Sequence, residues 1–210
     1  MTKQTSTVSL NMYITLDEAN QLRLDDHLEE AINIYQSCIE RFGKEVDFLA
    51  MIAHLRFKLA LGNANETGEN YKKAIQCLEA ALELEPNNAV LHAQLAEVYT
   101  LGTLNYILAA QEYRRALEIS PNNVSILFGA TSLYGLPEEV VMLDEAIRWM
   151  EQATTLSPDN PHFHIRLGNL YQEAGRMLDA RRAWLKSYLC SQPLGTDYAQ
   201  SIRNRFEGLG

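Results

Sequence analysis

The sequence is poor in cysteine, proline and glycine, and it has no long hydrophobic run. Its three cysteines, Cys38, Cys77 and Cys190, lie far apart and lack the paired spacing of a zinc site or a redox centre. We therefore expect reduced thiols with a structural role. No window approaches the roughly 20 apolar residues of a membrane-spanning helix, which predicts no direct membrane insertion.

Positive charge is scarce as well. The 210 residues include 18 Lys and Arg against 27 Asp and Glu, a formal net charge of −9, which opposes general nucleic-acid binding. Residues 1–11 form a polar tail with one Lys and no apolar run, so we expect neither a secretory signal nor an anchor there. These features predict a cytoplasmic protein.

Residues that would carry catalysis or bind a metal do not converge in this sequence. His162 and His164 are the only close histidine pair. Residues i and i+2 point about 200° apart on a helix, so the two rings cannot share a metal ion, and we expect both on the surface. Neither a nucleophile with its base nor a glycine-rich phosphate loop is visible. We predict a non-catalytic protein with no cofactor.

A repeated pattern of small, large and small residues is the strongest signal present. An alanine recurs at intervals of 43, 35, 37 and 34 residues, at Ala31, Ala74, Ala109, Ala146 and Ala180. A large residue follows four positions later, at Tyr35, Leu78, Tyr113, Met150 and Trp184, and a small one seven positions later, at Cys38, Ala81, Ala116, Ala153 and Ser187. Two antiparallel helices approach closely only where neither has bulk, so the pattern predicts packed helical hairpins.

Further positions give the hairpins a family resemblance. Leu95–Ala96 with Tyr99, Leu167–Gly168 with Tyr171, Gly175, and the helix-ending Pro86, Pro121 and Pro158 resemble the tetratricopeptide repeat family over residues 12–193. The resemblance implies an all-α, right-handed α-α superhelix of five hairpins, at about 12–45, 46–88, 89–123, 124–160 and 161–194. A C-terminal capping helix is expected at 196–206, where Tyr198, Ile202 and Phe206 share one face.

Departures from a 34-residue period predict where the longer loops lie. A polar, glycine-bounded stretch at 62–70 is expected to be an exposed loop between two helices. A second loop is expected around 136–142, where Pro137 ends the first helix and Glu138 and Glu139 begin the second. Gly129 and Gly135 are expected within the helix that precedes this loop.

The resemblance also implies a binding surface. In tetratricopeptide proteins the first helices of successive repeats line a concave groove that holds a peptide or protein. Carrying the groove register over predicts these contacts: Leu16, Asn20, Arg23, Met51, Gln94, Glu97, Phe128, Ser132, Arg166, Asn169, Gln172 and Glu173. The second repeat leaves two registers open, one with Ala50, Met51, His54 and Phe57 and the other with Met51, Ile52, Leu55 and Lys58.

Chaperone-binding members of this family hold a C-terminal carboxylate with a Lys and Asn on one first helix and with further Asn, Lys and Arg on the next two. Leu16, Ala93, Phe128 and Ile165, with Ala50 or Met51, stand where that leading Lys is expected. Asn20 and Asn169 match the asparagine alone, and Arg166 the arginine alone. Binding to a chaperone C-terminal tail is therefore disfavoured.

Two functions remain open from the sequence. The first is an adaptor or assembly factor that binds a peptide or folded partner in the groove. The alternative is a constitutive structural subunit of a larger complex, soluble or membrane-associated. For this alternative, the segments CLEAALELEPNN, AEVYT and SILFGA resemble parts of a tetratricopeptide subunit of the eukaryotic ER membrane protein complex, over two repeats only.

Overall fold

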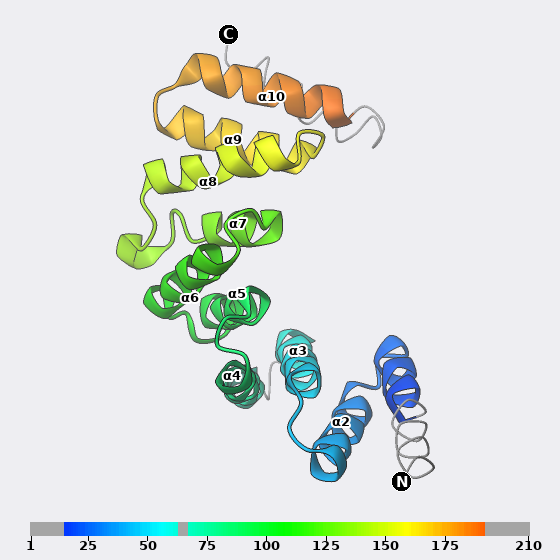
Figure 1. Cartoon of the computed structure of the whole chain (residues 1–210). Coiled ribbons are helices and arrows are strands. Elements are labelled where there is room, and N and C mark those ends of the chain that lie inside the picture. The colour runs from blue at the N-terminus through cyan, green and yellow to red at the C-terminus, as the bar shows by residue number, and fades with distance from the viewer. Residues whose placement is uncertain (1–14, 63–66, 192–210) are drawn as a thin grey trace. The chain divides into compact units, whose positions relative to one another are not determined.

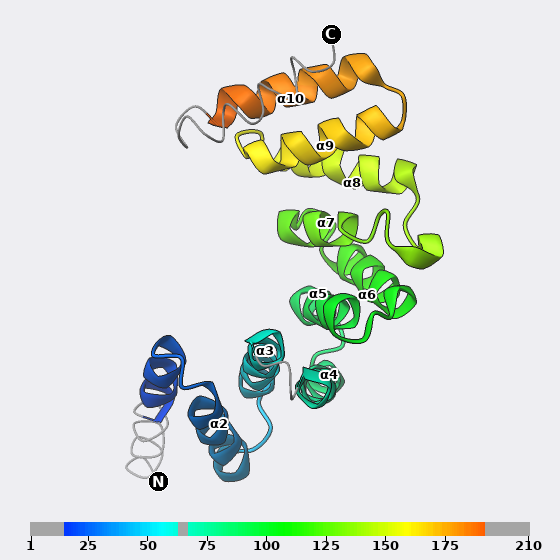
Figure 2. The ribbon, with the colours of Figure 1, turned by 180° about the vertical axis from the view of Figure 1, so that it is seen from behind.

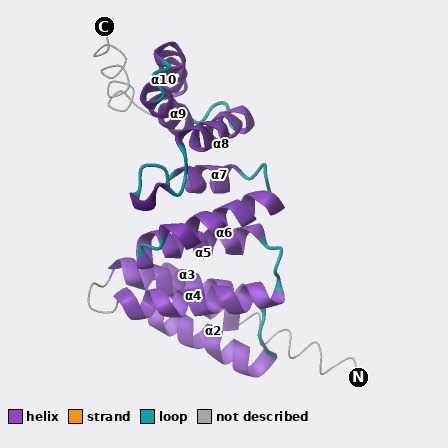
Figure 3. Ribbon diagram, turned by 90° about the vertical axis from the view of Figure 1, so that its left-hand side faces the viewer, coloured by secondary structure: helices purple, strands orange, loops and turns teal. Residues whose placement is uncertain are grey.

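The computed structural model describes residues 15–62 and 67–191 of the chain. It divides into two compact units, Met1–Asn105 and Tyr106–Gly210, named here the N-terminal and the C-terminal unit and described separately. Across the described residues the secondary structure is helix and loop without strand (Figure 3). No helix in this part of the chain is both long and apolar enough to span a bilayer.

The N-terminal unit is built from helices that pack in chain order. A helix covers residues 15–24, followed by α2 (Leu28–Phe42), α3 (Val46–Gly62), α4 (Thr67–Leu84), α5 (Ala89–Val98) and the π-helical turn η1 (Tyr99–Thr103). Each of α2, α3 and α4 contacts the helix that follows it (Figures 1 and 2). α5 begins where it does because the Asn88 side chain accepts hydrogen bonds from the backbone N–H of Val90 and Leu91.

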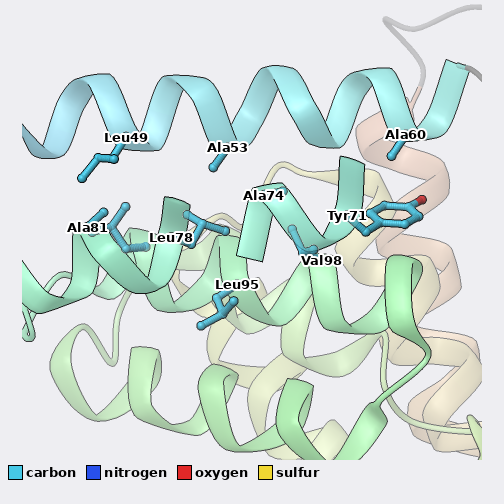
Figure 4. Packing of buried hydrophobic residues seen from close by; sticks show 10 residues of the cluster. Leu49, Ala53, Ala60, Tyr71, Ala74, Leu78, Ala81, Leu95 and Val98 are labelled. Carbon is cyan, nitrogen blue, oxygen red and sulfur yellow. The ribbon is translucent and has the colours of Figure 1, made fainter. Parts of the chain in front are cut away.

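Small residues let these helices approach. Ala53 and Ala60 of α3 point toward α4, and Ala74 and Leu78 of α4 point back (Figure 4). Both Ala74 and Ala81 are fully buried, which is the close contact that the repeated alanine predicts. Tyr71 packs at the end of this layer, where a Cβ added to Gly102 would lie 2.5 Å from its ring.

The C-terminal unit continues the same construction. Its elements are α6 (Tyr106–Ile119), α7 (Val124–Thr131), the 3₁₀ turn η2 (Pro137–Glu139), α8 (Leu143–Leu156), α9 (Pro161–Glu173) and α10 (Met177–Ser191). Each α-helix from α6 to α9 contacts the next. Asn123 and Asn160 cap α7 and α9 through their side-chain oxygens, as Asn88 caps α5, so each repeated Pro-Asn or Pro-Asp turn ends in a helix cap.

A tryptophan and a glycine fix the last hairpin. The Trp184 side chain is 1% exposed, and a Cβ added to Gly168 would lie 2.4 Å from its Nε1. Gly168 is therefore required by the indole that rests on it. The fold class is confirmed: an all-α arrangement of tetratricopeptide-type hairpins in each unit. Residues 1–11 and the capping helix predicted at 196–206 lie outside the described residues.

The loop prediction at 62–70 was wrong in extent, whereas residues 136–142 lie between α7 and α8 as predicted. α4 begins at Thr67, so residues 67–70 are helical and not part of a loop at 62–70. Asn70 is buried because its Oδ1 accepts a hydrogen bond from Arg56, whose guanidinium also binds Glu29 at 2.7 Å. Asn70 thus provides a hydrogen-bond acceptor for the buried Arg56. The polar composition of the stretch does not predict this contact.

The second connection also differs from its prediction. α7 ends at Thr131, and Gly135 lies beyond it with φ at +83°. Glu138 and Glu139 do not begin α8, because both have positive φ in the 3₁₀ turn, and α8 starts at Leu143. Asp144 and Glu145 supply the acidic first turn there instead.

Only one histidine of the pair lies on the surface. His162 is exposed, but His164 is buried, at 8% exposure. The His164 Nε2–H donates to the backbone oxygen of Pro158 over 2.7 Å, because a carbonyl can only accept. The prediction that both rings are exposed was wrong for His164, which secures the turn before α9.

Candidate functional site

One cavity in the N-terminal unit gathers predicted groove residues from different helices. It lies between α3, α4 and α5 and has a volume of about 60 Å³. Its lining is Ala53, His54 and Phe57 from α3, Leu78 from α4, and Gln94, Glu97 and Val98 from α5. The small Ala53 and the spacing of three or four residues along each helix leave this hollow between the larger side chains.

The cavity distinguishes the two registers of the second repeat. His54 and Phe57 belong to one register and line the cavity. Ile52 and Leu55 belong to the other and are buried in the core, at 3% and 0% exposure. Met51, which both registers share, packs against the core between α2 and α3 and does not line the cavity.

The polar side chains of this cavity have no partner among the described residues. The Oε1 atom of Gln94 is buried and accepts no hydrogen bond. His54 and Glu97 are exposed and take part in no hydrogen bond or ion pair within the described chain. A buried acceptor without a donor costs roughly 1–3 kcal/mol, so the unpaired Gln94 oxygen lowers the stability of the unliganded protein.

The corresponding residues of the C-terminal unit form hydrogen bonds within the protein. Ser132 Oγ donates to the Gly129 carbonyl at 2.6 Å, and Arg166 Nη2 donates to the Thr131 carbonyl at 3.0 Å. The Tyr134 hydroxyl donates to Glu173 Oε2 at 2.8 Å, and this bond raises the pKa of Tyr134. The predicted residues Ser132, Arg166 and Glu173 therefore already have hydrogen-bond partners within the protein.

Phe128 and Gln172 are two more predicted groove residues of this unit. Phe128 is 41% exposed and its ring lies 5.4 Å from that of Phe163. Gln172 is exposed, and its side chain has no hydrogen-bond partner within the described chain. The surface of α9 thus offers one free amide beside side chains that already have partners.

Two asparagines at the same place in the repeat share one structural role. Asn169 accepts a hydrogen bond from Trp184 Nε1 at 3.2 Å, and Asn20 accepts one from the Tyr35 hydroxyl at 3.3 Å. In both cases the donor is the large residue four positions after the repeated alanine. The asparagine therefore ties the two helices of a hairpin, which explains its presence without a bound carboxylate.

At the N-terminal end of the predicted surface, Leu16 packs against the apolar core of α2 and α3. The Nε atom of Arg23 is buried and has no partner in the described chain. No group of three or more His, Cys, Asp or Glu side chains able to hold a metal ion occurs within residues 15–62 and 67–191. The cavity, with its apolar walls and few polar groups, has the composition of a binding site.

Sequence reasoning missed three of the lining residues and one hydrogen-bond partner. Leu78 was assigned only to helix packing and Ala53 and Val98 were not singled out, although each borders the cavity. The spacing of Leu78 from Ala74 contained that signal, because the large residue fills the space between hairpins. The bond from Tyr134 to Glu173 spans 39 residues and has no signal in local sequence.

Comparison with known proteins agrees with this fold. Tetratricopeptide repeat family models match residues 56–88 and 143–198. The human RANBP2-like and GRIP domain-containing protein 1 is 28% identical over 126 residues, which are 57% of this chain and 7% of that protein. The E3 SUMO-protein ligase RanBP2 of Pan troglodytes is 26% identical over 126 residues, which are 57% of this chain and 4% of that protein. The chain thus spans less than a tenth of these relatives.

Solved structures share the fold at low sequence identity. MamA from Desulfovibrio magneticus RS-1 has a TM-score of 0.68 at 18% identity, covering 88% of this chain and 97% of that one. YrrB, described as a TPR protein with an unusual peptide-binding site, has a TM-score of 0.64 at 21% identity, with 90% of each chain covered. A thermophilic TPR protein of Thermus thermophilus has a TM-score of 0.59 at 18% identity, covering 93% of this chain and 97% of that one.

Proposed function

Because the chain belongs to the tetratricopeptide repeat family, we propose that it is a non-catalytic, cytoplasmic adaptor or assembly factor. It binds a peptide or protein partner on the surface that α3 and α5 form in the N-terminal unit. The family is a scaffold for protein interactions, so the partner is decided by the side chains of this surface and not by the fold.

The cavity between α3 and α5 carries this proposal. It combines an apolar lining with three polar side chains that have no partner within the described protein. Ligand sites have this composition, because apolar contact gives affinity and a few polar groups fix orientation. A bound donor would also remove the cost of the unpaired Gln94 oxygen. The peptide-binding site named for YrrB supports this use of the fold.

A second function, a structural subunit of a larger complex, is favoured by the outer face of α10. Leu178, Leu185 and Leu189 are 73%, 46% and 57% exposed. Their spacing of seven and four residues places them on one face of the helix. An exposed apolar stripe of this kind is typical of a surface that another protein covers.

A peptide-display screen separates the two functions. The wild-type chain is expected to enrich a set of peptides, and His54→Ala with Glu97→Ala should abolish their binding. Leu185→Lys with Leu189→Lys changes the α10 face and should leave peptide binding intact. Arg166 and Asn169 are unsuitable for this purpose, because their substitution breaks internal hydrogen bonds.

The outcomes are read after circular dichroism shows that each variant is folded. Enrichment that survives the α3–α5 substitutions contradicts the assigned surface. A wild-type chain that enriches no peptide, together with loss of a native complex in the α10 variant, supports the structural subunit.

A further inference from the structure

We infer that the cavity between α3 and α5 binds a peptide segment in which an aliphatic side chain lies next to a basic residue. This inference rests on the proposed function and specifies the chemistry of its partner. The aliphatic group enters the cavity, a backbone N–H of the peptide donates to Gln94, and the basic side chain pairs with Glu97.

The size and lining of the cavity select the aliphatic side chain. Its apolar walls are Ala53, Phe57, Leu78 and Val98, and the Phe57 ring is held in place at 5.9 Å from the ring of Tyr71. An apolar cavity of about 150 Å³ holds benzene, so a cavity of about 60 Å³ suits the end of a Leu, Ile or Met side chain better than an aromatic ring.

The Gln94 oxygen defines what must lie beside that side chain. This atom is buried and lacks a donor in the described protein, and the Gln94 residue lines the cavity. A peptide that enters the cavity brings its own backbone N–H groups, and these are obligatory donors once water is removed. A partner that offered only acceptors would leave the oxygen unpaired.

The charge of the cavity lining determines which residue the peptide carries next to its aliphatic side chain. Glu97 lies three positions after Gln94, on the same face of α5, and has no counterion among the described residues. The cations of α3 are already neutralised, since Lys58 binds Asp26 at 2.7 Å and Arg56 binds Glu29 at 2.7 Å. The lining therefore contains an unpaired carboxylate and no Lys or Arg.

The wider charge of this unit points the same way. Residues 1–105 contain eight Lys and Arg against fifteen Asp and Glu, a formal charge of −7. Such a field speeds the approach of a basic peptide and repels an acidic one. An acidic peptide or a free C-terminal carboxylate is therefore excluded as the occupant.

Nine fluorescent peptides of equal length test the inference against the full chain by polarisation. The central pair combines Leu, Ala or Trp with Arg, Ser or Glu in a Gly-Ser background. The peptide with Leu–Arg is expected to bind tightest. Replacing its Leu by Ala or Trp, or its Arg by Glu, should weaken binding by about tenfold, the effect of losing a desolvated contact or an ion pair.

Reversing the charge of Glu97 on the protein provides the decisive test. Glu97→Arg should invert the preference, so that Leu–Glu binds better than Leu–Arg, and Glu97→Gln should remove the preference without a new charge. Glu83→Arg makes the same charge change on an exposed residue of α4 outside the cavity lining and should leave the ranking unchanged. Gln94→Met keeps the volume, removes the acceptor and should weaken every peptide.

Two failures can be told apart. If peptides bind but Leu–Glu equals Leu–Arg, or if Glu97→Arg leaves the ranking as it was, the inferred chemistry is wrong while the peptide-binding function stands. If neither these nine peptides nor any displayed peptide binds the folded wild-type chain, both the inference and the proposed function are overturned.

Discussion

Equivalent polar side chains of α9 and α5 differ in whether they have a hydrogen-bond partner inside the protein. On α9 of the C-terminal unit, Arg166 and Asn169 complete hydrogen bonds to α7 and α10. On α5 of the N-terminal unit, Gln94 and Glu97 make none within the described residues. The repeat geometry is the same, so the difference lies in which side chains the neighbouring helices supply.

A groove position in a helical repeat therefore does not by itself identify a binding residue. A polar side chain that finds its partner inside the protein adds to stability and has little left to offer a ligand. A polar side chain that finds none is available to a ligand, and where its polar atom is buried it also lowers stability.

The largest effect is expected from crowding the indole in the C-terminal unit. Gly168→Ala places a Cβ within 2.4 Å of Trp184 Nε1 and 2.5 Å of Cδ1, so the ring must move and its bond to Asn169 is strained. Overpacking of this kind costs about 1–3 kcal/mol. Urea denaturation should show the loss, and Gly68→Ala, whose Cβ meets no described atom within 4 Å, should show none. Equal midpoints for the two variants would contradict the packing role of Gly168.

The next effect is a loss of stability at high pH. Tyr171 donates to Glu151 Oε1 at 2.6 Å, and burial together with this bond raises its pKa to about 12. Because the folded state favours the neutral phenol, its contribution is complete below the unfolded pKa near 10 and is lost as pH rises toward 12. At about 1.4 kcal/mol for each pKa unit, the loss is on the order of 2 kcal/mol.

Tyr171→Phe provides the control for this pH dependence. The variant lacks the titrating hydroxyl, so its free energy of unfolding should fall less steeply than that of the wild type between pH 10 and pH 12. Parallel curves would show that Tyr171 titrates normally and that its bond to Glu151 contributes nothing.

The repeat itself was readable from sequence because its determinants are local and steric. The five repeated alanines are all fully buried, and the large residues four positions later are at most 6% exposed. A residue that must be small for two helices to meet leaves a periodic trace in the sequence. The Pro-Asn turns were equally readable, since Asn88 and Asn123 cap the helices that follow them.

The loops and the candidate site were less readable because their determinants are distant in sequence. The 62–70 stretch is polar, yet Asn70 is buried and accepts a hydrogen bond from Arg56 of the preceding helix. Family register supplied the positions of Gln94 and Asn169 but not which of the two side chains has a hydrogen-bond partner. Whether such a side chain has a partner depends on residues far along the chain, such as Trp184, 15 positions from Asn169.

A smaller effect is expected when an internal bond of the C-terminal unit is removed. Asn169→Ala leaves the Trp184 N–H buried without its acceptor, which costs about 1–2 kcal/mol. The same change should leave the affinity for the peptide with Leu–Arg at its wild-type value. Thermal unfolding and polarisation measure the two quantities, and Gln172→Ala, an exposed residue of α9 without a partner, should change neither. Weaker peptide binding by Asn169→Ala would show that α9 also contacts the ligand.

The smallest effect should have the opposite sign. Gln94→Met retains the length of the side chain and removes an oxygen that is buried without a donor, so the free energy of unfolding should rise by about 1 kcal/mol. Urea denaturation of the unliganded chain measures this gain, and Glu97→Gln, an exposed residue of the same helix, should leave stability unchanged. A variant that is more stable and binds peptide less well would show that the N-terminal unit keeps an unfavourable acceptor for its ligand. A variant that is less stable would mean that the Gln94 oxygen finds a donor in the free protein, and the contrast between the two units would then disappear at this position.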